Sequence, residues 1–236
     1  MKKKIFNGKI RETLKRWHPD YVPAQDLTEA VPESGAKRYW FLVRNHFFKL
    51  LCTSALYLLT CIPVVTIPAS TAGLCHVMME LERKGNVISW WSAYFTGFRD
   101  RIGDRFLVGL GSISLPCCVA ILLLSLKVNE IVALCIAFGI YLLCNSVWQY
   151  FLVLQDTMNL TLGQNLRNAV LLALTNIKIT LILVLCVLAF TGILLYLFPY
   201  WVIPFAFFGF AAKQLMACNL IWPIVKERLV VEEEDM

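Results

Sequence analysis

Six apolar runs constrain this chain more than any other feature, because about 20 apolar residues are enough to cross a bilayer as a helix. The runs lie at residues 44–62, 68–83, 106–126, 131–155, 178–198 and 201–222. Of the 236 residues, 58% are hydrophobic and 16% are charged, which is not the composition of a soluble domain. The sequence therefore predicts an all-α fold: a polytopic membrane helix bundle of about six transmembrane helices, with interfacial helices on the cytoplasmic side.

When the chain is passed through the membrane in these six spans, most of its basic residues fall on one side of the membrane. If residues 1–44 are cytoplasmic, 19 of the 22 lysines and arginines fall on that side, and only Lys127 falls on the other. Lys49 and Lys213 lie within spans, near the span ends, from where their long side chains can snorkel to the interface. This distribution satisfies the positive-inside rule. It predicts that both termini are cytoplasmic and that the lipid partner is the anionic inner leaflet.

The chain is expected to divide into three regions. They are a basic cytoplasmic leader and linker at 1–43, a transmembrane helical domain at 44–222, and a charged cytoplasmic tail at 223–236. The start of the leader is either an amphipathic helix on the membrane surface or a solvated segment that fixes orientation. Segments 93–100 and 169–176 each precede a long apolar span, which suggests a parallel repeat of a hairpin followed by an interfacial helix.

The second run, 68–83, is the shortest and most polar of the six. A helix of this length falls short of the roughly 30 Å hydrocarbon core, so it must be tilted, packed inside the bundle, or re-entrant. Its small residues from Ser70 to Gly73 favour close packing against a neighbouring helix. A segment that returned halfway would place the basic loop 83–105 outside, so we expect six spans.

Pro63 and Pro68 bracket the tip of the first predicted hairpin, where missing backbone donors are tolerated. The simple interpretation is a turn. In the functional interpretation, Thr66, Ser70 and Thr71 line a small polar pocket at a helix break, as in transporters with interrupted helices.

Polar residues within the spans provide two further candidate sites. His76 and Glu80 are four residues apart and would share a helical face, which suggests either a proton-responsive pair or ordinary solvation of a helix end. Asn145 and Gln149 are also four apart, in the middle of the fourth span, and should face the bundle interior because polar groups are costly in lipid. They would either hydrogen-bond between helices or line a solute path.

The segment before the third span combines aromatic and charged side chains. Trp90, Trp91, Arg99, Asp100 and Arg101 form either a surface for a partner's cytoplasmic domain or an interfacial belt with basic anchors.

Motifs for catalysis, metal binding and nucleic-acid binding are missing from the sequence. All nine cysteines lie in apolar runs, which is typical of small packing residues and not of a disulfide framework. The histidines have no second histidine or cysteine pair at ligand spacing. We therefore expect no enzymatic activity, no cofactor, no metal and no nucleic-acid partner. The oligomeric state is not predicted.

The stretch Pro63-Val-Val-Thr-Ile-Pro-Ala-Ser-Thr-Ala72, followed by an aromatic segment ending in Phe98-Arg-Asp100, resembles the YesL-like family of bacterial membrane proteins. The resemblance extends over about residues 40–225, and the chain departs from the family pattern in its long basic leader. The family is a domain of unknown function, often found beside carbohydrate-uptake transporters. The resemblance thus implies a multi-pass protein of the bacterial plasma membrane with a role related to sugars, and no catalytic residues.

Two functions remain open from the sequence. The first is a non-catalytic accessory or regulatory partner of a carbohydrate uptake system, with possible contacts to membrane transporter subunits. The alternative is a small-solute transporter or channel whose path is lined by Thr66, Ser70, Asn145 and Gln149.

Overall fold

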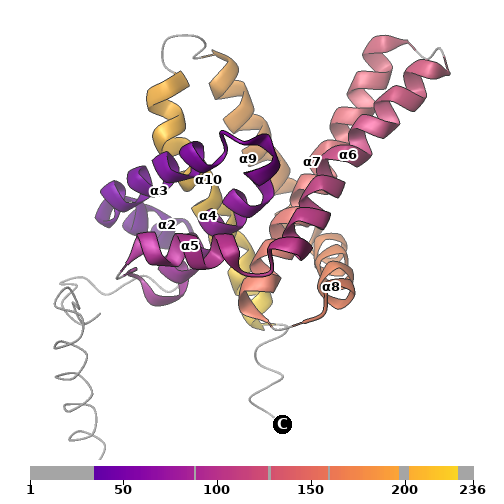
Figure 1. The fold of residues 1–236 in the computed structure, drawn as a ribbon. Coiled ribbons are helices and arrows are strands. Elements are labelled where there is room, and N and C mark those ends of the chain that lie inside the picture. The colour runs from indigo at the N-terminus through magenta and orange to yellow at the C-terminus, as the bar shows by residue number, and fades with distance from the viewer. Residues whose placement is uncertain (1–34, 88, 127–128, 159, 197–201, 228–236) are drawn as a thin grey trace, which may run out of the picture.

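The computed structural model describes residues 35–87, 89–126, 129–158, 160–196 and 202–227, and helices are the only regular structure in these ranges (Figure 1). The predicted all-α class is confirmed for this part of the chain. The leader up to residue 34, Lys127 and the tail from residue 228 lie outside the described residues. In chain order the elements are α2 (Gly35–Asn45), α3 (Phe47–Thr60), the 3₁₀ turn η2 (Val64–Thr66), α4 (Ile67–Lys84), α5 (Trp90–Arg99), α6 (Ile102–Ser125), α7 (Glu130–Thr157), α8 (Leu162–Thr175), α9 (Ile177–Tyr196) and α10 (Val202–Val225).

Four helices within the described residues are long and apolar enough to cross a membrane. They are α6, α7, α9 and α10, which meet this criterion over 102–125, 130–157, 177–194 and 207–225. The ends of these helices lie within four residues of the last four predicted spans. This part of the membrane prediction follows directly from the length of the apolar runs.

The first two predicted spans form a shorter hairpin. The run at 44–62 is divided at His46, whose Nε2 lies 2.9 Å from the carbonyl oxygen of Gly85, and α3 has only 14 residues. At 1.5 Å per residue, α3 rises about 21 Å, less than the roughly 30 Å hydrocarbon core. Neither α3 nor α4 is among the helices long and apolar enough to cross a membrane. The boundary expected at residue 43 falls inside α2, whose Leu42 is fully buried.

α4 is an internal helix of the bundle. Twelve of its 18 residues are buried, and it packs against α3, α5, α6, α7 and α10. α5 crosses α4 at close range, as the small residues of α4 predicted. A Cβ added at Gly73 would lie 2.8 Å from the carbonyl oxygen of Tyr94, and one added at Gly97 would overlap the Cβ of His76. Such approaches are possible only where one helix presents glycine.

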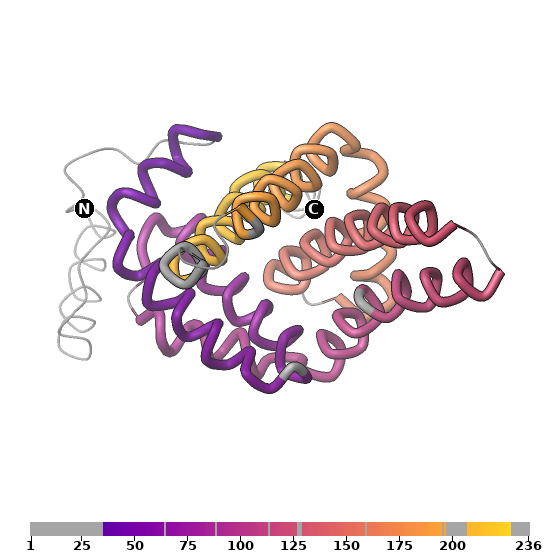
Figure 2. The backbone as a smooth tube through the Cα atoms, turned by 90° about the horizontal axis from the view of Figure 1, so that it is seen from above, coloured from indigo at the N-terminus to yellow at the C-terminus, as the bar shows by residue number. Residues whose placement is uncertain are grey.

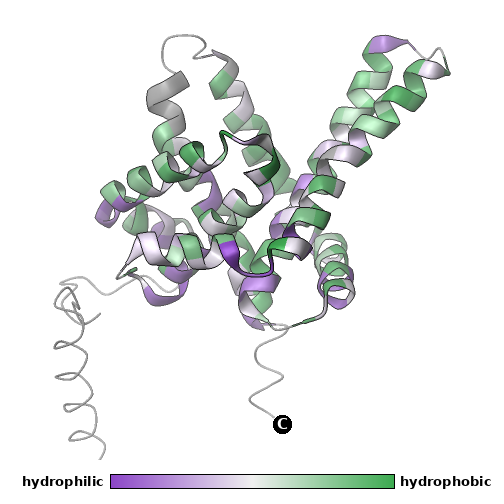
Figure 3. Cartoon of the chain, viewed as in Figure 1, coloured by the Kyte–Doolittle hydropathy of each residue, from purple (hydrophilic) through white to green (hydrophobic). Residues whose placement is uncertain are grey.

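Two hairpins extend from this body. Figure 1 shows α6 and α7 as an antiparallel pair that leads away from the other helices, with α9 and α10 as a second pair. Seen from above, α10 lies centrally (Figure 2), where it packs against α2, α3, α4, α7 and α9. Hydrophobic residues dominate both hairpins, whereas hydrophilic residues gather mainly at the end of the bundle that holds α4, α5 and α8 (Figure 3).

The helix ends near this polar region are fixed by local signals. The side chain of Ser89 accepts a hydrogen bond from the backbone N–H of Ser92 (3.4 Å) at the start of α5. The side chain of Asn129 caps α7 in the same way, through the N–H of Ile131 (3.0 Å). α4 ends at Gly85, whose φ of 71° is readily adopted only by glycine. These signals position α5 and the base of α7 beside α4.

Candidate functional site

The predicted hairpin break is a closed turn. The hydroxyl of Thr66 donates to the carbonyl oxygens of Pro63 (2.6 Å) and Thr60, and Thr71 donates to the carbonyl oxygen of Ile67 (2.8 Å). These hydroxyls therefore satisfy backbone carbonyls at the break instead of pointing into a pocket. Pro68 occupies the first turn of α4, where its missing N–H needs no partner.

Ser70 and Pro68 lie inside the protein. Both are buried, and a Cβ added at Gly109 of α6 would lie 2.5 Å from the Cβ of Pro68. This end of α4 packs tightly against α6.

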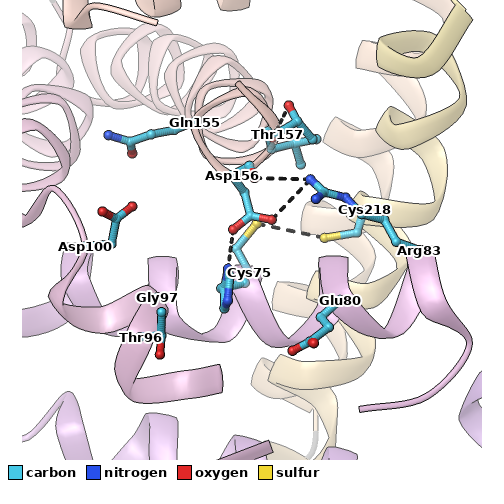
Figure 4. Close-up of polar contacts among 12 residues, drawn as sticks. Cys75, Glu80, Arg83, Thr96, Gly97, Asp100, Gln155, Asp156, Thr157 and Cys218 are labelled. Carbon is cyan, nitrogen blue, oxygen red and sulfur yellow. Dashed lines mark hydrogen bonds and ion pairs between the residues drawn. The ribbon is translucent and has the colours of Figure 1, made fainter. Parts of the chain in front are cut away.

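His76 pairs with an aspartate from another helix and not with Glu80. His76 Nδ1 and Asp156 Oδ1 are hydrogen-bonded, and Arg83 donates to the backbone oxygen (3.2 Å) and Oδ2 (3.4 Å) of Asp156. Glu80 bonds instead to Lys84 at 2.5 Å. Figure 4 shows Asp156 reaching toward α4 and Arg83, with Glu80 turned away. Of the two interpretations, the Glu80–Lys84 pair supports ordinary solvation of the helix end, and a His76–Glu80 pair is not formed. The base of α7 packs on the His76 side of α4 and supplies a nearer carboxylate.

A buried arginine extends this polar cluster to α6 and α5. The side chain of Arg105 is 2% exposed, and its Nε donates to Gln155 Oε1 at 2.9 Å. The remaining nitrogens bond to the carbonyl oxygen of Gly97 and to Asp100 Oδ2, the latter at 3.2 Å. Arg105 thus connects the start of α6 with α5 and α7. The guanidinium fork allows one side chain to satisfy three partners at once.

A second buried ion pair joins α2, α4 and α10. Arg38 Nε lies 2.6 Å from Glu82 Oε1, and Asn219 donates to the same oxygen at 3.1 Å. Glu82 is 2% exposed. Sequence reasoning missed this group, because Glu82 looks like the end of an apolar run and its partners lie 44 and 137 residues away.

The outward face of α5 lines an open groove of about 730 Å³. Trp91, Phe95 and Arg99 follow one another at intervals of four residues, so they lie along one side of the helix. The rings of Trp91 and Phe95 are 5.0 Å apart, and the Trp91 side chain is 54% exposed. Within the described part of the chain, Arg99 forms none of the ion pairs or side-chain hydrogen bonds. We call this groove the α5 groove. Its lining residues are Trp91, Ser92, Phe95, Thr96, Arg99 and Asp100.

The other members of the predicted partner surface make contacts within the protein, although the Asp100 side chain is 55% exposed and lines the groove. Trp90 is half-buried and packs on the core. Asp100 pairs with Arg105, and Arg101 donates to the carbonyl oxygen of Leu160 at 2.7 Å. The structure thus divides this set: Trp91 and Arg99 are available at the surface, whereas Asp100 and Arg101 hold neighbouring elements in place.

The inner face of α5 fixes the groove to the body of the protein. Tyr94 is fully buried, and its hydroxyl lies 2.5 Å from the hydroxyl of Thr60 in α3. Burial raises the pKa of Tyr94 to about 12, so the phenol stays neutral at physiological pH. Tyr94 therefore joins α5 to α3.

Asn145 and Gln149 lie on the side of α7 that faces α9 and α10. Gln149 is buried and accepts a hydrogen bond from Gln214 Nε2 at 2.8 Å, which joins α7 to α10. Asn145 and Gln149 line a small cavity that also includes Lys213. Thr66 and Ser70 are not among its lining residues, so the four predicted path residues do not share one cavity.

Lys213 is the most unexpected residue of this cavity. It lies at the middle of the 24-residue α10 and not near a span end. α10 continues for three turns on either side of it, so Lys213 is not at a helix end, and its snorkelling to the interface stays a prediction.

Comparison with protein-family models, curated proteins and solved structures finds no match to this chain. The resemblance to the YesL-like family stays a prediction. Among the described residues, no group of three or more histidine, cysteine, aspartate or glutamate side chains is placed to hold a metal ion.

Proposed function

We propose that this chain is a non-catalytic integral protein of the bacterial plasma membrane that serves as an accessory or regulatory partner of a carbohydrate uptake system. The observation that carries the proposal is the α5 groove, a surface with an exposed tryptophan and an arginine that forms no ion pair within the described chain. Exposed aromatic and arginine side chains are the usual anchors of protein interfaces. The sugar-related setting comes from the family resemblance alone.

The proposed topology has six membrane-inserted helices. α6, α7, α9 and α10 cross fully, while α3 and α4 form a shorter hairpin that enters and leaves on one side. This arrangement keeps α5, α8 and both termini on the cytoplasmic side, as the distribution of basic residues requires. The α5 groove then faces the cytoplasm, where the peripheral domains of uptake systems are found.

The proposed occupant of the groove is an amphipathic helix of a transporter subunit. Trp91 and Phe95 offer apolar contact along one side of α5, and Arg99, one turn further, offers a positive charge. A partner helix with apolar side chains followed by a carboxylate at the same spacing would match both features. A charge-assisted hydrogen bond to Arg99 would fix its register.

The test is crosslinking of the full chain in its native membrane, followed by mild purification and mass spectrometry. We expect a sugar permease subunit to be recovered with the unaltered chain. Its recovery should fall at least tenfold in Trp91→Ala and in Arg99→Ala, since central interface anchors typically contribute about 2 kcal/mol or more. Arg167→Ala is the matched control, because Arg167 is an exposed arginine on α8, another short helix.

Equal recovery of the subunit with Trp91→Ala, Arg99→Ala and the unaltered chain would reject the groove as the docking surface. Joint replacement of Arg99, Asp100 and Arg101 is a poorer test, because Asp100 and Arg101 make internal contacts.

The alternative function, a small-solute transporter, has its support in the polar cavity beside Asn145 and Gln149. Recovery of the chain without any transporter subunit, together with substrate-dependent flux in vesicles, would favour this alternative.

A further inference from the structure

Asp156 is the point at which the base of the α6–α7 hairpin meets α4 through charge. Its side chain is 7% exposed, and its carboxylate accepts hydrogen bonds from His76 Nδ1 and from Arg83, which are both on α4. Arginine is a permanent cation, whereas histidine gains and loses a proton close to neutral pH. The net charge of this contact between α4 and α7 therefore changes with pH.

The hydrogen bond to Asp156 decides which nitrogen of His76 exchanges its proton. An ionised carboxylate only accepts hydrogen bonds, so Nδ1 carries a hydrogen in both charge states of the ring. The exchangeable proton is therefore on Nε2. Within the described part of the chain, Nε2 of His76 takes part in none of the side-chain hydrogen bonds. The side chain is 29% exposed, so water can deliver and remove the proton.

The charges around the His76 ring favour its protonated form. Asp156 raises the pKa of His76 above its ordinary value of 6.5, chiefly through the hydrogen bond, while burial of the ring opposes this rise. Glu80, one turn further along α4, acts in the same direction as Asp156, and Arg105 of α6 acts against it. The folded protein thus binds this proton more tightly than the unfolded chain does.

Charged and titratable groups on the other elements that pack against α4 have partners of their own. Asp100, which ends α5, pairs with Arg105 at 3.2 Å. The thiol of Cys218 in α10 faces the thiol of Cys75 at 3.9 Å. Further charged side chains of these helices lie elsewhere: Arg99 lines the α5 groove, Lys49 of α3 bonds to Asn86, and Lys213 of α10 lies over the Phe190 ring.

We propose that His76 and Asp156 form a proton-binding site that fastens the base of the α6–α7 hairpin to α4. A proton taken up at Nε2 converts a neutral hydrogen bond into an ion pair, and its release reverses the change. Arg83 keeps its charge throughout, so it holds Asp156 without responding to pH. The outer part of the hairpin leads away from the other helices (Figure 1), so contacts at its base decide how firmly it is held. This inference is independent of the α5 groove and of the proposed partner.

The direction of the pH dependence follows from the raised pKa of His76. Stabilisation by this proton is fully present below the ordinary value of 6.5, and it is lost as the pH rises through the higher pKa of the folded protein. The contact between α4 and α7 is therefore tightest in acid and loosest once His76 has lost its proton.

The test compares thermal unfolding of the purified full chain with that of His76→Asn, both in nanodiscs, as the pH is raised. The asparagine amide can still donate to Asp156 from the position of Nδ1, but it cannot take up a proton. We expect the unaltered chain to unfold at the higher temperature in acid. This advantage should shrink by about 2–4 °C between about pH 6 and about pH 9, as the loss of roughly one pKa unit of linkage requires.

His46→Gln is the matched control, because it removes the other histidine of the described residues and keeps a donor for the carbonyl oxygen of Gly85. It should leave the pH response intact. In Asp156→Asn the carboxylate that favours the proton is gone, so a further change of His76 to asparagine should have an effect that does not vary with pH. An advantage of the unaltered chain that stays constant with pH would overturn the proposal, as would one that shrinks equally in the Asp156→Asn background.

NMR of isotope-labelled histidine rings measures the same proton in the unaltered chain, so the outcome does not depend on whether the Asp156 variant folds. The signal that disappears in His76→Asn should titrate above the ordinary value for histidine. A His76 ring that titrates at or below that value would mean that Asp156 forms only a structural hydrogen bond, and the proposal would be rejected.

Discussion

Asp156 links two helices through a single carboxylate. It bonds to His76 and Arg83 of α4, and its side chain is only 7% exposed. Arg83 in turn lies over the Trp222 ring of α10, 4.9 Å from the centroid. The Glu80–Lys84 pair, by contrast, lies within one helix and reaches solvent, with Lys84 66% exposed. Solvent screens the second pair more than the first, so the two carboxylates should differ in their contribution to stability.

We expect Asp156→Asn to lower the free energy of unfolding by about 2 kcal/mol, because the hydrogen bonds that the carboxylate forms with His76 and Arg83 lose its charge. Glu80→Gln makes the same chemical change at an exposed pair, and its effect should stay below about 1 kcal/mol. Unfolding in mixed detergent, followed by circular dichroism, measures both. Similar losses in the two variants would contradict the assignment of Asp156 as the structural partner of His76.

The sequence could not reveal this partner. Helical periodicity relates His76 to Glu80 within one helix, but Asp156 is 80 residues away. Which helix lies beside His76 depends on how α7 packs, and an apolar run carries no information about that. Gln149 faces the bundle interior, as expected. Its partner Gln214 could not be predicted, because the sequence does not show that α10 packs against α7 at this point.

At the level of elements, α5 owes its position to its close approach to α4. Gly97 of α5 faces the backbone of Gly73 and the Cβ of His76. An added methyl group at position 97 has no space unless the two helices separate. Separation would also move Arg105, which donates to the carbonyl oxygen of Gly97.

Gly97→Ala should therefore destabilise the protein by about 1–3 kcal/mol, the usual range for overpacking. Gly103→Ala is the matched control, since a Cβ added there meets no atom within 4 Å. That control should leave stability unchanged or raise it slightly through helix propensity. A proteolysis assay of the 85–105 region would show whether α5 separates from α4. Equal stability of both variants would show that the crossing is looser than described.

The sequence predicted elements with unequal success, for physical reasons. α6, α7, α9 and α10 were predicted within four residues because their apolar runs exceed the length of a crossing helix. The break at His46 was not predicted, since no proline or glycine marks it and its cause is a tertiary contact to Gly85. α4 was recognised as atypical from its polar residues, but the burial of Glu82 required the partners on α2 and α10.

For the whole molecule, the proposed orientation can be tested by side-specific labelling. Glu130 is exposed at the far end of the α6–α7 hairpin, and Ser92 is exposed on α5. In intact cells, an impermeant maleimide should label Glu130→Cys from outside and should label Ser92→Cys only after permeabilisation. The unaltered chain supplies the background from its own cysteines. Labelling of Ser92→Cys in intact cells would reverse the topology and remove the α5 groove from the cytoplasm.

The α6–α7 hairpin is anchored to the remainder of the described chain only near its base. Only 12% of the residues in the most apolar stretch of α6 are buried. The outer part of the pair leads away from the other helices (Figure 1). No contact among the described residues fixes its slope at that height, so we expect lipid to do so. A thicker bilayer should make the hairpin stand more upright and a thinner one should tilt it further. The membrane's own thickness thereby becomes a structural parameter of this protein, and the setting in which it is purified will select one of a range of shapes.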